Sequence, residues 1–148
     1  MIGLPKKAEY ALRAVFELAY RNTRCPVKIH DIAQAQAVPP RFLEGILNQL
    51  RHAGVVESRR GSDGGYLLAS SARMISVADV IEIVEGVLSV APQSKDGSRV
   101  AGVGEFALTG LWREVDEVLV RILKNTMIAD LVERERNHLQ ELAPDYCI

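Results

Sequence analysis

The sequence has few of the residues that build metal centres, disulfide frameworks or membrane spans. Its 148 residues include only two cysteines, Cys25 and Cys147, far apart and outside any CxxC or Cys/His array, and its three histidines, His30, His52 and His138, are scattered. We therefore expect no metal site, no cofactor and no structural disulfide. No apolar run is long enough to cross a bilayer, and the opening MIGLPKKAEY lacks the charge order of a secretory signal. These absences predict a cytoplasmic protein that does not contact the membrane.

The chain also lacks an excess of charge of either sign, because its formal net charge is −1, but the two halves differ. Residues 1–70 hold ten Lys and Arg against six Asp and Glu, a formal charge of +4; residues 71–148 hold eight against thirteen, a charge of −5. A polyanion would be attracted to the first half and repelled by the second. The asymmetry suits a DNA-binding head on an acidic body, although differences of this size also arise by chance.

Hydrophobic periodicity predicts a mainly α-helical protein with one small β-hairpin. Apolar residues recur at helical spacing over about 5–20, 29–36, 40–53, 76–86, 104–124 and 127–142. The segments VVESRR and YLLA are strand-like, and GSDGG between them suits a hairpin turn. Val27 to Ile29 could add a short strand, and the helix at 29–36 is expected to bury Ile29, Ile32 and Ala33. Three helices followed by a hairpin describe a winged helix-turn-helix head.

Turn and capping residues divide the chain further. Gly54 is expected to end the third helix in the left-handed conformation, Ser76 and Asp79 form a capping-box pattern, and Thr126 can cap the last helix. Residues 87–103 have no period and contain Pro, Gly and Ser, which predicts a mobile loop. We divide the chain into a DNA-binding domain at 1–72 and a helical dimerisation and sensor region at 73–148.

The third predicted helix carries polar residues opposite its apolar stripe. Arg41, Glu44, Gly45 and Asn48 recur at a spacing that places them on one face. Arg can pair with guanine, Asn with adenine, and Glu can accept a hydrogen bond from cytosine; each good contact discriminates by roughly 1–3 kcal/mol. A glycine inside a helix costs about 1 kcal/mol relative to alanine, which suggests that something must approach the backbone there. The alternative is a solvated face with an ion pair between Arg41 and Glu44.

The hairpin has a basic and glycine-rich tip that could lie beside this helix in a DNA groove. Adjacent strand residues point to opposite faces, so we expect only one of its two arginines to enter a groove while the other contacts phosphate. Alternatively the arginines only solubilise the hairpin and the glycines only satisfy turn geometry. The residues assigned to this predicted DNA contact are Arg59, Arg60, Gly61, Ser62, Gly64 and Gly65. Lys6, Lys7 and Arg13, near the first helix, could neutralise phosphates.

The long helix near residues 104–124 carries an apolar seam with alternating spacings of three and four residues, typical of a coiled coil. The seam could cover the first helix of the same chain or pair with a second copy. A head of about 70 residues cannot bury so long an apolar helix alone, so we expect a homodimer. The predicted interface consists of Leu108, Leu111, Trp112, Val115, Val118 and Ile122.

Several segments together resemble the Rrf2 family of bacterial winged-helix regulators of iron–sulfur assembly, nitric-oxide response and cysteine metabolism. They are KKAEYALRAVFELA at 6–19, FLEGILNQLRHAGVVESRRGSDGGYLL at 42–68, SVADVIEIVEG at 76–86, LWREVDEVL at 111–119 and NTMIADL at 125–131. The resemblance implies a homodimer that pairs through the long helix and binds partly symmetric operator DNA. It also implies that Arg41, Glu44 and the Arg60 wing read the DNA, and that Tyr10 helps to position the head.

The chain departs from the family members that hold an iron–sulfur cluster with three cysteines in the loop before the long helix. At the matching positions stand Ser94, Val100 and Phe106, and the position of a further histidine ligand is occupied by Thr109. Valine and phenylalanine offer no metal ligand, so the resemblance does not carry the cluster over. Cys25, beside Arg24, is a candidate redox thiol, with a small partly buried hydrophobe as the alternative.

Taken together, these features predict a sequence-specific DNA-binding transcriptional regulator that acts as a homodimer, and a repressor rather than an activator. The alternative is a winged-helix module that binds a protein or a small molecule without reading DNA. An enzyme is not expected, because no nucleophile–base pair, phosphate-cradling loop or carboxylate dyad stands out. The sequence leaves the operator and the identity of an effector, a small molecule or a protein, open.

Overall fold

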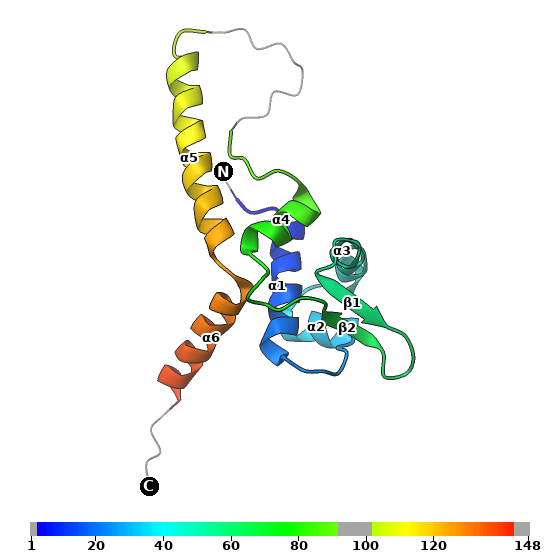
Figure 1. The fold of residues 1–148 in the computed structure, drawn as a ribbon. Helices are drawn as coiled ribbons and strands as arrows, with labels where there is room; N and C mark the ends of the chain where they lie inside the picture. The colour runs from blue at the N-terminus through cyan, green and yellow to red at the C-terminus, as the bar shows by residue number, and fades with distance from the viewer. Residues whose placement is uncertain (1–2, 92–101, 144–148) are drawn as a thin grey trace.

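The structure, a computed structural model, describes residues 3–91 and 102–143. Within these ranges the chain forms six helices and one two-stranded antiparallel sheet, which confirms the predicted mainly α fold with a hairpin (Figure 1). The elements are α1 (Lys6–Arg21), α2 (Ile29–Gln36), α3 (Pro40–His52), β1 (Val56–Arg59), β2 (Gly65–Leu68), α4 (Val77–Glu85), α5 (Glu105–Asn125) and α6 (Ile128–Leu142). No helix in these ranges is both long and apolar enough to span a bilayer.

Helix α1 lies at the centre of the core and packs against α2, α3, α4 and α6. Its buried face is rich in alanine, with Ala8, Ala11 and Ala14 fully inaccessible to solvent. Small side chains let the neighbouring helices approach closely, so one helix can serve several packing partners. One charged residue, Glu17, is also buried in α1, where its two carboxylate oxygens accept from Arg21 Nε and Gln36 Nε2, each at 2.6 Å. Both oxygens are therefore satisfied, as a buried carboxylate requires.

The hairpin is fixed to the head at its base. Strands β1 and β2 pair from Val56 opposite Leu68 to Arg59 opposite Gly65. On the other edge, Val27 exchanges two backbone hydrogen bonds with Tyr66, at 2.9 and 2.8 Å. The predicted short strand at Val27 to Ile29 is thus reduced to one bridging residue, because the helical conformation of α2 already begins at Ile29.

The helix ends follow the predicted chemistry with one exception. Gly54 has a φ of +79° after α3, and Ser76 and Asp79 form the predicted capping box at α4. The prediction for Thr126 is wrong: its hydroxyl donates to the carbonyl oxygen of Ile122 at 2.8 Å and closes α5, while Met127 is the N-cap of α6. A threonine between two helices can serve either end, and here the carbonyl of the preceding turn is the partner it reaches.

The junction between α5 and α6 is bonded to the start of α4. The backbone N–H of Val77 donates to Thr126 O at 2.9 Å, and that of Ile128 donates to Ile75 O at 2.8 Å. Ile128 and Val132 of α6 then enter the same hydrophobic cluster as the residues of α1 and α3. One core therefore extends across residue 72, and the predicted division at that point remains a proposal about which part binds DNA.

The predicted mobile loop 87–103 falls mainly on residues 92–101, outside the described ranges. Its first residues contact α5: Ser89 Oγ and the Val90 N–H both donate to the Asp116 carboxylate, at 2.7 and 2.6 Å. The described start of this segment is therefore held against the long helix.

Candidate nucleic-acid interface

Helix α3 separates its apolar and polar residues cleanly. Leu43, Ile46, Leu47 and Leu50 are buried against the head, while the four predicted base-reading positions Arg41, Glu44, Gly45 and Asn48 are all exposed. An ideal Cβ built on Gly45 meets no atom within 4 Å. Packing inside the protein therefore does not require the glycine, and the prediction that a partner approaches the backbone there stays a prediction.

The first turn of α3 carries an aromatic and cationic group that the sequence reading only partly foresaw. The guanidinium carbon of Arg41 lies 4.8 Å from the centroid of the Phe42 ring. The Phe42 ring in turn lies 5.7 Å from that of Tyr10 on α1. Stacking of this kind orders a long arginine side chain while leaving its hydrogen-bonding edge free. Tyr10 thus supports Arg41 through Phe42, a half-exposed residue that the sequence analysis did not select.

The exposed face of α3 is joined to the hairpin by a chain of hydrogen bonds. Arg51 Nη2 donates to Asn48 Oδ1 at 2.7 Å, and Arg51 Nη1 donates to Ser58 Oγ of β1 at 3.4 Å. The side-chain oxygen of Asn48 is therefore occupied, whereas the amide NH2 of Asn48 makes no hydrogen bond within the described residues. Arg51 and Ser58 were missed by the sequence analysis; the spacing of three residues from Asn48 to Arg51 was the signal that could have found Arg51.

The two arginines of the wing have different surroundings. Arg59 Nη2 lies 3.4 Å from Glu57 Oε1 in an exposed ion pair. Arg60 is exposed and has no side-chain partner in the described part of the chain. Of the two, Arg60 is the cation without an ion-pair partner among the described residues, and the prediction that only one of them enters a groove stays a prediction.

The three glycines of the hairpin tip are required for different structural reasons. A Cβ at Gly64 would collide with Arg59 O, and one at Gly65 with Val27 O, so both positions exclude any larger residue. Gly61 has a φ of +111°, in the region that favours glycine, and nothing surrounds it. Ser62 is exposed at the tip. Turn geometry and the contact with residue 27 thus account for Gly64 and Gly65 without DNA.

The basic residues of α1 are exposed but already engaged within the protein. Lys6 Nζ lies 2.9 Å from Glu9 Oε2, and Arg13 Nη2 lies 3.2 Å from Glu9 Oε1. The hydrogen bond from Lys6 lowers the pKa of Glu9, and the same bond raises the pKa of Lys6. Lys7 Nζ donates to the carbonyl oxygen of Val84 at the end of α4, at 2.9 Å. Phosphate contacts by these residues would compete with the internal partners.

The apolar seam of α5 is uncovered in the single chain, because no residue of this helix is buried. Trp112 is half-buried, and the other five predicted interface residues are exposed, by 54% at Leu108, 49% at Leu111, 37% at Val115, 45% at Val118 and 56% at Ile122. The first alternative, in which the seam packs against the first helix of the same chain, is wrong, because the seam residues do not cover α1. An apolar stripe of this length left in water marks an association surface.

Cys25 is exposed, in the loop between α1 and α2. Thr23 Oγ1 donates to the backbone carbonyl oxygen of Cys25 at 2.8 Å, which orders the loop around the thiol. Among the described residues no three His, Cys, Asp or Glu side chains lie close enough to hold a metal ion. Cys147 lies outside the described ranges.

Comparisons with known proteins identify relatives along nearly the whole chain. The model of the Rrf2 family, described as an iron-dependent transcriptional regulator, matches residues 4–134. The HTH-type transcriptional regulator IscR of Klebsiella pneumoniae is 36% identical over 134 residues, which are 89% of this chain and 80% of the relative. A candidate HTH-type transcriptional regulator of Mycobacterium tuberculosis, Rv1287, is 38% identical over 141 residues. These are 95% of this chain and 88% of the relative.

Solved structures give the same result for the fold. CymR, the global cysteine regulator of B. subtilis, aligns with a TM-score of 0.76 at 30% identity, covering 90% of this chain and 98% of that one. An oxidised form of CymR from Staphylococcus aureus aligns with a TM-score of 0.72 at 27% identity, covering 89% of this chain and 97% of that one.

The iron dependence in the family's description does not fit the residues of this chain. Of the positions that match the cluster ligands by resemblance, Ser94 and Val100 lie outside the described residues. Phe106 is 94% exposed at the start of α5 and has no ligating atom. Thr109 donates its hydroxyl hydrogen to Glu105 Oε1 at 3.5 Å. A phenylalanine and a valine cannot replace thiolates, so no iron chemistry is derived for this chain.

Proposed function

The chain belongs to the Rrf2 family of transcriptional regulators, and on that premise we propose that the exposed face of α3 and the wing between β1 and β2 bind adjacent grooves of double-stranded DNA. It is a DNA-binding transcriptional regulator and not an enzyme, as the sequence predicted. The alternative of a winged-helix module without DNA readout is not favoured by this membership. Binding to chromosomal DNA in turn supports a cytoplasmic location.

The observation that carries the proposal is the hydrogen-bonded chain from Asn48 through Arg51 to Ser58. It holds the exposed face of α3 against the strand that leads into the wing, so both act as parts of one surface. Within that surface Arg41 is available for guanine and Asn48, through its free amide NH2, for an acceptor on a base. Glu44, exposed on the same face, is suited to accept from cytosine N4.

We propose further that two chains pair through the seam of α5 and bind a partly symmetric operator. The support is the exposure of that seam in the single chain. Two-fold pairing of this class of head places half-sites about one helical turn, 34–36 Å, apart or at multiples of that distance. A dimer bound across a promoter would block the polymerase, and we therefore propose repression as the regulatory outcome.

The test is operator binding by an Arg60→Ala variant. DNA is selected from genomic fragments with purified wild-type protein, and affinity is measured by fluorescence anisotropy at fixed salt. Loss of one groove contact should weaken binding by about 1–3 kcal/mol, or 5- to 150-fold. The melting temperature should not change, because the Arg60 side chain has no partner among the described residues. Arg134→Ala, on exposed α6, serves as the control and should bind as wild type. Equal affinities for all three proteins would show that the wing is not a DNA element.

A second function, a thiol redox input, is favoured by the exposure of Cys25. An oxidised form has been crystallised for the related S. aureus CymR. We propose that oxidation of Cys25 changes operator affinity. The measurement compares wild type and Cys25→Ser before and after peroxide treatment; a wild-type affinity that does not change would reject the redox input and leave DNA binding intact.

A further inference from the structure

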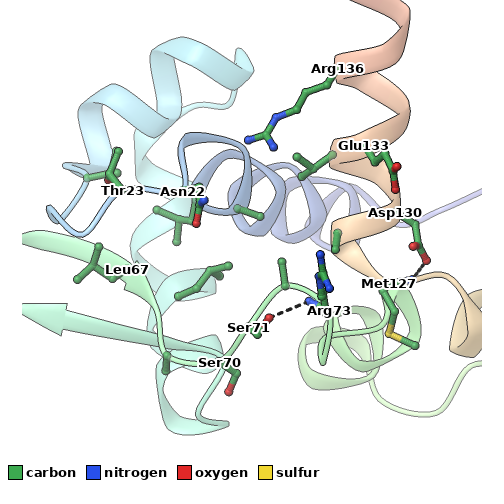
Figure 2. A pocket seen from close by; sticks show the side chains of 18 of the residues that line it. Asn22, Thr23, Leu67, Ser70, Ser71, Arg73, Met127, Asp130, Glu133 and Arg136 are labelled. Carbon is green, nitrogen blue, oxygen red and sulfur yellow. Dashed lines mark hydrogen bonds between the residues drawn. The ribbon is translucent and has the colours of Figure 1, made fainter.

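A hollow of about 1110 Å³ lies between the end of α1, the connection from β2 to α4, and α6 (Figure 2). Leu18, Val27 and Leu67 are among its apolar lining residues, and Asn22 and Ser70 are among its polar ones. None of the residues predicted to bind DNA lines it. The hollow is therefore a separate feature of the molecule, placed where the head meets the helix that follows α5.

Two arginines on different walls are directed into this hollow. Figure 2 shows the Arg136 side chain reaching in from α6 and the Arg73 guanidinium pointing in from the β2–α4 connection. Arg136 is held in place, since its Nη2 donates to Tyr20 O at 3.0 Å and its guanidinium carbon lies 5.6 Å from the centroid of the Tyr20 ring. The Arg73 guanidinium makes no hydrogen bond or ion pair within the described residues.

The carboxylates in the lining form no ion pair with these arginines within the described residues. Asp130 Oδ2 accepts the backbone N–H of Met127 at 2.8 Å, as part of the cap of α6. Glu133, on the same helix, has no ion pair within the described residues, and Figure 2 shows both carboxylates on the side of α6 away from the two guanidinium groups. Within the described part of the chain, the hollow thus has one guanidinium held by Tyr20 and one without an ion-pair partner.

We propose that this hollow binds a small organic anion whose carboxylate or phosphate group lies between Arg73 and Arg136. A guanidinium presents parallel N–H donors that match either oxyanion, and the apolar lining residues would contact the carbon skeleton of the ligand. A bound anion would link the β2–α4 connection to α6, which already packs against α1. Because α6 follows α5 after two residues, occupancy would further restrict movement of the long helix relative to the head; any effect on operator affinity rests on the proposed function.

Isothermal titration calorimetry with the full chain tests the site without DNA. Succinate and inorganic phosphate, each at millimolar concentrations in low-salt buffer, distinguish the two oxyanion classes. We expect at least one of them to bind wild type and Arg134→Ala alike, and to bind Arg73→Ala at least about tenfold more weakly, as expected for loss of a charge-assisted hydrogen bond. The Arg73 side chain has no hydrogen-bond or ion-pair partner in residues 3–91 and 102–143, so this variant should fold as wild type does, which a thermal melt checks.

The other outcomes would reject either the anion site itself or only its effect on DNA binding. If neither probe binds, or if Arg73→Ala and Arg136→Ala bind the probe as wild type does, the site does not exist. If the probe binds but leaves the anisotropy of an operator complex unchanged, the binding site stands and control of DNA affinity through it is wrong. Failure of the wild type to bind any selected DNA would instead overturn the proposed function, with the calorimetry unaffected.

Discussion

Replacing Gly45 with alanine should make the protein more stable and a weaker DNA binder at the same time. The residue is exposed in the middle of α3, and an added Cβ would meet nothing within 4 Å. The variant should therefore gain the full difference in helix propensity, about 0.8–1.0 kcal/mol. For a chain of this size the gain corresponds to a rise in melting temperature of about 2–4 °C, which circular dichroism can measure.

The effect on DNA has the opposite sign if α3 lies in a major groove. A helix with its side chains nearly fills that groove, so a methyl group on the facing side must displace the helix and strain the neighbouring base contacts. Loss of a single such contact, about 1–3 kcal/mol, weakens binding 5- to 150-fold. The assay is anisotropy titration of a selected operator at one fixed salt concentration, since affinity depends steeply on salt.

Gly110→Ala is the matched control. Gly110 lies inside α5, and a Cβ there also meets nothing within 4 Å. It should bring a similar gain in stability while leaving operator affinity per dimer unchanged, with the dimer fraction checked by sedimentation. If Gly45→Ala melts higher and binds the operator as tightly as wild type, residue 45 does not face DNA and the assignment of the α3 face is refuted.

Three other predictions concern dimerisation, the base of the wing and the charges of α1. Val115→Glu places a charge in the proposed seam and should convert the dimer to monomers in sedimentation velocity; a variant that stays dimeric would reject this interface. Gly65→Ala forces a Cβ against the Val27 carbonyl and should lower the free energy of unfolding by about 2 kcal/mol or more, measured in urea; an unchanged midpoint would contradict it. Glu9→Gln removes the ion-pair partner of both Lys6 and Arg13 and should steepen the salt dependence of DNA binding by up to about two phosphate equivalents. The pKa of Glu9 is lowered in the folded chain, so its ion pairs stabilise the protein above the ordinary pKa of a carboxyl group and are lost as the pH falls through the lowered value. The free energies of unfolding of wild type and variant should therefore differ at neutral pH and converge in acid. A difference in free energy of unfolding that stays constant with pH would contradict this.

The elements could be predicted from sequence wherever local chemistry decides them. The leucines of α3 recur at helical spacing, so both the helix and its exposed face follow from the pattern alone. GSDGG between two strand-like segments predicts a hairpin turn from its glycines alone, and a Cβ at Gly64 would meet atoms of Arg59, Arg60 and Gly61 in that turn. Ser76 and Asp79, three residues apart, predict the capping box at the start of α4. Each of these features depends on residues that are close in the chain.

What the sequence could not provide are the contacts between distant segments. Lys7 donates to a carbonyl oxygen 77 positions away, and no local pattern indicates which carbonyl will be within reach. The pairing of Arg136 with Tyr20, 116 positions apart, and the hollow beside it have the same character. Thr126 shows the limit even at short range, because two helix ends compete for one hydroxyl and only the folded geometry decides between them.

The bonded junction between α5 and α6 has a geometric consequence for the whole regulator. Helix α5 has 21 residues and so extends about 30 Å from this junction. A rotation of about 10° there would move its far end by about 5 Å, more than the roughly 3.4 Å between successive base pairs. In the proposed dimer, the backbone bonds at Val77 and Ile128 would therefore help to fix the distance between the two heads, and a small rotation at this junction would shift one head relative to its half-site.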